Sequence, residues 1–191
     1  IVDSEPLHTA TKMETFHHFG IPFEERRLEQ YAGRTSKELF SDALADCPTA
    51  LTWKELADYK HRLYIDRLTH AADIVPIPGV VQLIARLHSK GNLLAVASST
   101  GRNIIEMVLR RFGVRPYFTA VISGAELPRS KPDPAIYCKA ADSLGIVPAH
   151  CTVIEDAAAG MTCIAYHNPN SGNQDLSCAD WIAESFDMIE P

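Results

Sequence analysis

The sequence lacks a hydrophobic run long enough to cross a membrane, because no apolar stretch approaches the roughly 20 residues that a membrane helix needs. Lys and Arg never form a run longer than a pair, and the net charge is −6. Both features disfavour sequence-independent binding to nucleic acid. The first residues hold no basic-then-apolar export segment. The five cysteines are odd in number and form no Cys-x-x-Cys pair, which disfavours disulfides and a zinc site. We therefore expect a soluble, cytoplasmic protein that binds neither membranes nor nucleic acid.

The first part of the chain shows only helical patterns. Of the 191 residues 46% are hydrophobic, which is enough to bury a core. One predicted helix begins at Ser4 with a proline in its first turn and ends at Gly20, a second begins near Thr35 or Ser36, and a third runs from Thr52 to about Thr69. Apolar residues recur along the first helix at near-helical spacing, at Leu7, Ala10, Met13, Phe16 and Phe19. Residues 4–75 therefore read as a small helical bundle.

The pattern changes after a stiff Pro-Ile-Pro-Gly boundary at residues 76–79. From there, short apolar runs alternate with amphipathic helices that end at Gly91, Gly113 and Gly145. The runs predicted as strands are 93–97, 120–122, 152–154 and 162–166. Short apolar strands that alternate with helices indicate an α/β fold with a parallel sheet covered on both faces.

The last two predicted strands are separated by an unusually short connection. Neighbouring parallel strands need a crossover of roughly 10 to 12 residues, but only five residues lie between Asp156 and Thr162. Either these strands form an antiparallel hairpin or a helix is missing from the sequence. The Ala-rich remnant at 157–159 favours the second alternative. Residues 1–3 likewise read as the tail of an earlier segment.

Polar residues follow three of the predicted strands, and ligands of open parallel sheets bind beyond the carboxyl ends of the strands. Ser98 and Ser99 precede a helix, where hydroxyls and free N–H groups could bind an anion, or one serine could simply cap the helix. Lys131, fixed between Ser130 and two prolines, could neutralise a phosphate or be a surface lysine. Glu155 and Asp156 could hold Mg²⁺, or they could stand at a helix N-terminus, where the helix dipole favours acidic residues.

An anion cradle, a fixed cation and a pair of carboxylates at one edge of a sheet indicate phosphoryl transfer. The residues alone reveal no nucleophile, because no remaining strand end offers an Asp, Cys or Ser in a suitable turn.

Four motifs in order resemble the haloacid dehalogenase-like (HAD) superfamily, and more closely its β-phosphoglucomutase-like branch of phosphatases and sugar-phosphate mutases. They are Val-Asp-Ser-Glu-Pro-Leu-His at 2–8, Ala-Ser-Ser at 97–99, Ser-Lys-Pro-Asp-Pro at 130–134 and Val-Ile-Glu-Asp at 153–156. The resemblance implies a Rossmann-like parallel sheet core, residues 1–3 and 76–191, with an inserted α-helical bundle cap domain, residues 4–75.

The resemblance also implies roles for individual residues. Ser98, with Ser99, would bind the transferring phosphoryl group, and Lys131 would bridge that phosphate and the nucleophile. Glu155 and Asp156 would hold Mg²⁺. In this branch the nucleophile and the general acid-base stand in an Asp-x-Asp-Gly segment just ahead of the Val-Asp-Ser motif, and the given sequence begins after that point.

Three residues of the helical part would also serve the site by this resemblance. His8 would handle protons as the cap closes, although it could be a buried helix histidine. Glu5 and Arg34 would face the substrate, although Arg34 could be a solvated helix-start arginine. The mutases carry a Lys and an Arg where this chain has Ala32 and Ser36, which favours hydrolysis.

The sequence thus predicts a monomeric, Mg²⁺-dependent phosphatase that acts on a small phosphorylated metabolite, a sugar phosphate, through an aspartyl-phosphate intermediate. One alternative is a hexose-phosphate mutase of the same branch. Another, of a different class, is a phosphate-binding homologue without catalytic activity. Halide removal from haloacids is disfavoured, because that reaction needs no metal and therefore no Glu155–Asp156 pair.

Overall fold

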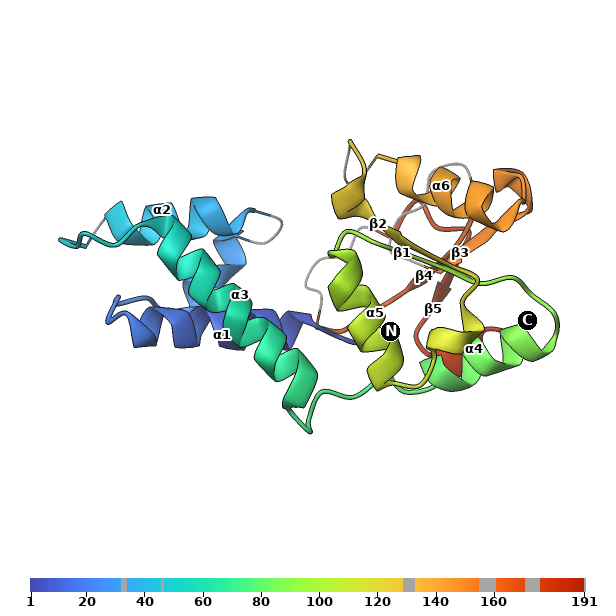
Figure 1. The fold of residues 1–191 in the computed structure, drawn as a ribbon, viewed down its shortest axis with the longest axis horizontal. Helices are drawn as coiled ribbons and strands as arrows, with labels where there is room; N and C mark the ends of the chain where they lie inside the picture. The colour runs from blue at the N-terminus through green and yellow to red at the C-terminus, as the bar shows by residue number, and fades with distance from the viewer. Residues whose placement is uncertain (32–33, 46, 129–132, 155–160, 171–175, 191) are drawn as a thin grey trace. The chain divides into compact units, whose positions relative to one another are not determined.

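The computed structural model describes residues 1–191 apart from 32–33, 46, 129–132, 155–160, 171–175 and 191. The chain forms two compact units (Figure 1). One unit comprises Ser4–Ile74, and the other comprises Ile1–Asp3 with Val75–Pro191. Within the described residues, no helix has both the length and the apolar composition that crossing a membrane would require.

The unit Ser4–Ile74 is entirely helical. It contains the helices α1 (Glu5–His18), α2 (Ser36–Ala45) and α3 (Trp53–His70), and a 3-10 helix over Glu25–Tyr31 that the sequence patterns did not predict. Helix α3 begins with a capping box, in which Thr52 accepts a bond from the Glu55 N–H and Glu55 accepts one from the Thr52 N–H. Ser4 stands at the N-cap of α1, as expected, but its side chain makes no capping bond.

The three helices pack around a core of their own. The apolar residues predicted at helical spacing contribute to it: Phe16 lies edge-on to Phe40 with ring centroids 5.4 Å apart, and both are almost fully buried. Leu56 of α3 belongs to the same hydrophobic cluster, and it is 0% exposed. The helical unit therefore has a hydrophobic cluster of its own, separate from the clusters of the α/β unit.

The second unit is an α/β fold in which the described strands pair in parallel, and one isolated antiparallel bridge joins Val2 to Pro76. Strands β1 (Ala95–Ser98) and β2 (Ala120–Ser123) form one sheet. Strands β3 (Thr152–Ile154), β4 (Thr162–Tyr166) and β5 (Trp181–Ala183) form the other. The antiparallel hairpin considered for β3 and β4 is therefore wrong, because Thr152, Val153 and Ile154 pair in parallel with Thr162, Cys163 and Ile164. Tyr166 was also expected to end the last strand, but β5 follows it.

Helices cover both faces of the β1–β2 sheet, as the sequence predicted. The helices of this unit are α4 (Val80–Ser89), α5 (Arg102–Arg111) and α6 (Ala135–Leu144). Paired residues Val96 and Val121 belong to the hydrophobic cluster that contains α4 and α5, whereas their neighbours Ala97 and Ile122 belong to the cluster of α6. Successive side chains of a strand point to opposite faces, so α5 and α6 lie on opposite sides of this sheet.

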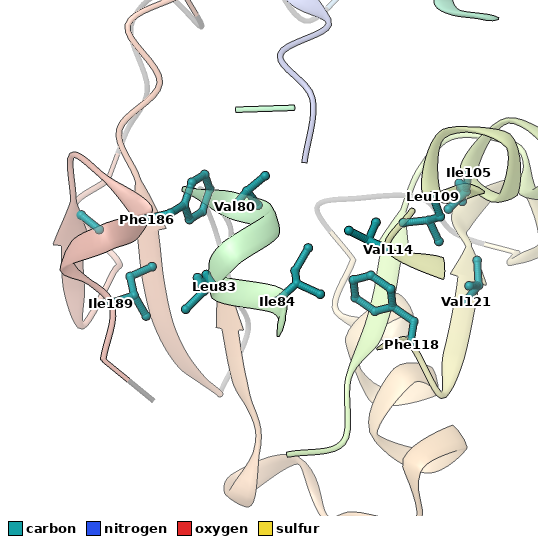
Figure 2. Close-up of a cluster of buried hydrophobic side chains, with 11 residues drawn as sticks. Val80, Leu83, Ile84, Ile105, Leu109, Val114, Phe118, Val121, Phe186 and Ile189 are labelled. Carbon is teal, nitrogen blue, oxygen red and sulfur yellow. The ribbon is translucent and has the colours of Figure 1, made fainter. Parts of the chain in front are cut away.

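The larger cluster also fixes the end of the chain. In Figure 2, Val80 and Leu83 of α4 lie beside Phe186 and Ile189, which follow β5. Gly79 is the N-cap of α4, and its φ of +80° favours glycine. A Cβ at this position would meet a carboxylate oxygen of Asp187 at 3.0 Å. Glycine at the predicted boundary thus lets the C-terminal segment pack against the start of α4.

Candidate active site

Ser98 is the last residue of β1, and its hydroxyl shapes the turn that leads into α5. The sequence placed this serine in the loop, but it still pairs with Ser123 at the carboxyl end of β2. Its Oγ accepts a hydrogen bond from the Thr100 N–H at 3.2 Å. The residue at the N-cap of α5 is Gly101, which has no side chain to cap the helix. No serine therefore caps α5 directly, and no side chain at the N-cap accepts a hydrogen bond from the first N–H groups of the helix.

The carboxyl end of β2 holds this turn in place. Ser123 is 1% exposed, and its Oγ donates a hydrogen bond to the Thr100 carbonyl oxygen at 2.8 Å. A Cβ on Gly124 would lie 3.1 Å from the Cα of Ser99 and 3.4 Å from the Ser98 carbonyl oxygen. The missing side chain therefore permits close approach of the two strand ends.

Arg102 ties the start of α5 to the same region. Its Nε and Nη2 donate to the two carboxylate oxygens of Glu126, both at 2.7 Å, and its Nη1 donates to the Val121 carbonyl oxygen at 2.7 Å. A bidentate pair of this kind fixes geometry more firmly than a single ion pair. Sequence reasoning missed Arg102, Ser123, Gly124 and Glu126. A Ser-Gly pair directly after a predicted strand was the one available signal.

The remaining predicted residues of the α/β unit cannot be placed in the same way. Lys131, Glu155 and Asp156 lie outside the described residues. Ile154, the residue before Glu155, is the last of β3 and is 36% exposed. Elsewhere in the described chain, no group of three or more His, Cys, Asp or Glu side chains could hold a metal ion. Two adjacent carboxylates are nevertheless a donor set of the type that Mg²⁺ prefers.

In the helical unit, His8 of α1 meets two residues of α3. The Nδ1 of His8 lies 2.8 Å from the Nζ of Lys60. The imidazole stacks on the ring of Tyr64, with centroids 4.4 Å apart and planes 1° from parallel. The Lys60 ammonium also lies over the Tyr64 ring, 4.8 Å from its centroid. His8 was predicted, whereas Lys60 and Tyr64 were not, because packing of α1 on α3 brings them together from 52 residues or more along the chain.

This arrangement shifts the charge of both basic groups. Burial, with the charges of Lys60 and Lys12, lowers the pKa of His8 from 6.5 to about 4. Burial and the charge of Lys12 lower the pKa of Lys60 to about 8, and the charge of Glu5 opposes this shift. At pH 7 His8 is therefore neutral and Lys60 is mostly charged. Since an ammonium can only donate a hydrogen bond, the Nδ1 of His8 accepts one from the Lys60 Nζ. The ring proton of the neutral imidazole is therefore on Nε2.

The two other predicted residues of this unit differ in their surroundings. Glu5, the first residue of α1, is close enough to act on the pKa of Lys60. Arg34 is engaged by α2 instead: its Nε and Nη2 donate to Glu38 at 3.3 Å, its Nη2 lies 3.8 Å from Asp42, and it sits over the Tyr31 ring. Ser36 is the first residue of α2, and Ala32 lies outside the described residues.

Known proteins resemble this chain over most of its length. A family model described as haloacid dehalogenase-like hydrolase matches residues 1–166. The β-phosphoglucomutase of Bacillus subtilis is 30% identical over 169 residues, which cover 86% of this chain and 74% of that protein. Hexitol phosphatase B of Escherichia coli K12 is 29% identical over 166 residues, 84% of this chain and 72% of that protein. CbbY from Rhodobacter sphaeroides, solved in complex with xylulose-(1,5)bisphosphate, has a TM-score of 0.77 at 25% identity, and the match covers 97% of this chain and 90% of CbbY.

Proposed function

The chain belongs to the haloacid dehalogenase-like hydrolase family, and we propose that it is a Mg²⁺-dependent phosphatase of small phosphorylated metabolites, in particular sugar phosphates. The relatives support this substrate class by their names, which include a hexitol phosphatase and a β-phosphoglucomutase. In this proposal the unit of Ile1–Asp3 with Val75–Pro191 is the Rossmann-like catalytic core, and the helical unit is its cap domain.

The turn at the end of β1 is the observation that carries the proposal. The Ser98 hydroxyl stands at the carboxyl end of a parallel strand, next to the N-terminus of a helix that no side chain caps. Such a place binds anions, because free N–H groups and the helix dipole favour negative charge. Ser123 and Gly124 hold the turn rigidly, as preorganised stabilisation of a phosphoryl group requires.

Each residue then has a definite task. Ser98 donates to an oxygen of the transferring phosphoryl group, and Ser99 lines the same turn. Lys131 neutralises the phosphoryl group beside the nucleophile. Glu155 and Asp156 would hold Mg²⁺, which supplies further neutralisation of charge when bound. In the cap, the Nε2–H of neutral His8 donates to an oxygen of the substrate while Lys60 fixes the ring. Glu5 and Arg34 belong to the face of the cap that selects the substrate.

In the branch that this chain resembles, the aspartate that forms the aspartyl-phosphate stands in an Asp-x-Asp segment, and no such segment occurs in the 191 residues. We therefore include in the proposal an Asp-x-Asp-Gly segment ahead of residue 1 in the natural chain. Sequencing the coding DNA upstream of Ile1 tests this part directly. Its absence from the gene would leave a phosphate-binding homologue without this chemistry.

The activity is tested with the protein expressed from its complete natural gene. Phosphate release from a panel of sugar phosphates should occur with Mg²⁺ and stop when EDTA removes it. Ser98→Ala should lower kcat/KM by about a hundredfold, the usual effect of removing one donor to developing charge. Isomerisation of a hexose 1-phosphate that outpaces phosphate release would make the protein a mutase instead. No release from any ester, with the Asp-x-Asp segment present, would overturn the proposal.

A further inference from the structure

His8, Lys12 and Lys60 act on one another electrostatically in the helical unit, where the charge of Glu5 opposes the effect of Lys12 on Lys60. His8 and Lys12 are four residues apart on α1, so they lie on the same face of that helix. Lys60 reaches this face from α3 and contacts the His8 ring at 2.8 Å. Within the described part of the chain, neither Lys12 nor Lys60 forms an ion pair with Asp or Glu.

The packing and the electrostatics of Lys60 both indicate that its charged form destabilises the folded state. The Lys60 side chain is half-buried, and its ammonium contacts the Nδ1 edge of the His8 ring and the face of the Tyr64 ring. Lys12 adds a second positive charge that acts on both His8 and Lys60, and Glu5 is the nearby group that opposes it. Desolvated like charges destabilise a fold unless an opposite charge is present.

We propose that His8, Lys12 and Lys60 form a binding site for an oxyanion group of the substrate, a phosphate or a carboxylate. The site offers two ammonium groups, and the Nε2–H of the neutral imidazole adds a third donor, which together match the oxygens of such a group. Lys12 is then a specificity-determining residue that selects metabolites with an anionic group at this position. This inference rests on the proposed function for the identity of the substrate, but the binding itself can be measured without catalysis.

Binding is followed at the His8 ring, which reports on its immediate surroundings. The protein is labelled with ¹⁵N-histidine and titrated with sodium phosphate or sodium acetate, with sodium chloride holding the ionic strength constant. We expect saturable changes of the His8 signals, and a rise of the His8 titration midpoint when the site is filled. The anion that binds more tightly identifies the group. Changes with neither anion beyond those with chloride would overturn the site.

Three variants locate the binding. Lys12→Met should weaken the response of His8 at least tenfold. Lys54→Met is the matched control, because Lys54 is also on the helical unit but is exposed and already paired with Asp58 at 2.7 Å. Ser98→Ala should leave the response of His8 unchanged, since Ser98 belongs to the other unit. Equal weakening in the two lysine variants, or loss of the response in Ser98→Ala, would refute a site at Lys12.

Activity then separates the two proposals. With a bisphosphorylated sugar or a phosphorylated sugar acid, Lys12→Met should raise KM about tenfold with little change in kcat. With a neutral sugar monophosphate its KM should change less than twofold. If no ester is hydrolysed but His8 still binds phosphate through Lys12, the phosphatase proposal fails and the anion site stands. If esters are hydrolysed and both substrate classes respond alike, the anion site fails and the phosphatase stands.

Discussion

At the scale of single residues, His8 makes the stability of the protein depend on pH. Its pKa is 6.5 in the unfolded chain and about 4 in the folded one, because of burial and the charges of Lys60 and Lys12. Between these values the unfolded state binds more protons, so the free energy of unfolding falls as the pH falls from 6.5 to 4. The full shift corresponds to about 3 kcal/mol.

His8→Gln should remove this contribution. We expect the variant to lose less stability than the parent protein on going from pH 7 to pH 4, as measured by urea unfolding at several pH values. His17→Gln is the control, since His17 lies on the same helix but is exposed. A parallel pH dependence for parent and His8→Gln would show that other groups cause the acid sensitivity.

Lys60 should lower the stability of the folded protein while it supports activity. Its pKa falls from 10.5 to about 8, chiefly through burial, so the folded state disfavours its charge at pH 7. The unfolded state binds more protons between pH 8 and 10.5, so the parent protein gains stability over that range.

Lys60→Met should therefore raise the Tm at pH 7, and this advantage should shrink as the pH approaches 10.5. The same variant should reduce kcat/KM, because His8 loses the group that fixes its ring. Thermal unfolding at pH 7 and pH 10 checks the first part, and phosphate release checks the second. A Tm below that of the parent at both pH values would contradict the assignment of Lys60 as a destabilising functional residue.

At the scale of elements, the end of β2 should control the turn that follows β1. Ser123→Ala removes the bond from Oγ to the Thr100 carbonyl oxygen, and Gly124→Ala pushes a Cβ against Ser99. Each should lower kcat/KM by about tenfold, since small displacements of positioned groups are costly to rate. For Ser123→Ala the decrease in Tm should be small, because one hydrogen bond contributes about 1 kcal/mol to the free energy of unfolding.

Ser143→Ala is the matched control for these variants. Ser143 makes an equivalent 2.8 Å bond to a backbone carbonyl, but it lies on the exposed face of α6. Its kcat/KM should equal that of the parent protein. If Ser123→Ala and Ser143→Ala behave alike in steady-state kinetics, the end of β2 does not position the turn.

Elements with a strong pattern could be predicted from the sequence, and weakly patterned ones could not. Regular apolar spacing predicted α1, and short apolar runs predicted β1 to β4. Strand β5 has only three residues and exposes Trp181 and Ile182, so it lacks the alternation of a half-buried strand. The 3-10 helix Glu25–Tyr31 is short and mostly charged or polar, so it has no periodic apolar face.

In the candidate site too, some residues could be predicted from the sequence and others could not. Ser98 could be predicted because a local rule, polar residues after a strand, identifies it. Lys60 could not, because its partner His8 is 52 residues away and only the packing of α1 on α3 joins them. Ser123 was missed for a similar reason, since its bond to Thr100 depends on the pairing of β1 with β2. Contacts between distant segments carry no local signal.

At the scale of the whole molecule, the two units should respond differently to magnesium. Each unit has its own hydrophobic cluster, and Glu155 and Asp156 belong to the α/β unit. Two adjacent carboxylates repel each other without a cation, so a bound ion stabilises that unit directly. At a hundred times its Kd, Mg²⁺ adds about 2.7 kcal/mol, or roughly 8 to 16 °C in Tm for a unit of this size.

The two tryptophans provide a separate probe for each unit, because Trp53 begins α3 and Trp181 begins β5. In a Trp53→Phe variant, fluorescence follows the α/β unit, and in a Trp181→Phe variant it follows the helical unit. Mg²⁺ should raise the transition seen by Trp181 by the larger amount. Asp156→Asn should abolish this rise, while sodium chloride at equal ionic strength should not reproduce it. An unchanged rise in Asp156→Asn would mean that the ion binds elsewhere, and the magnesium site would have to be reassigned.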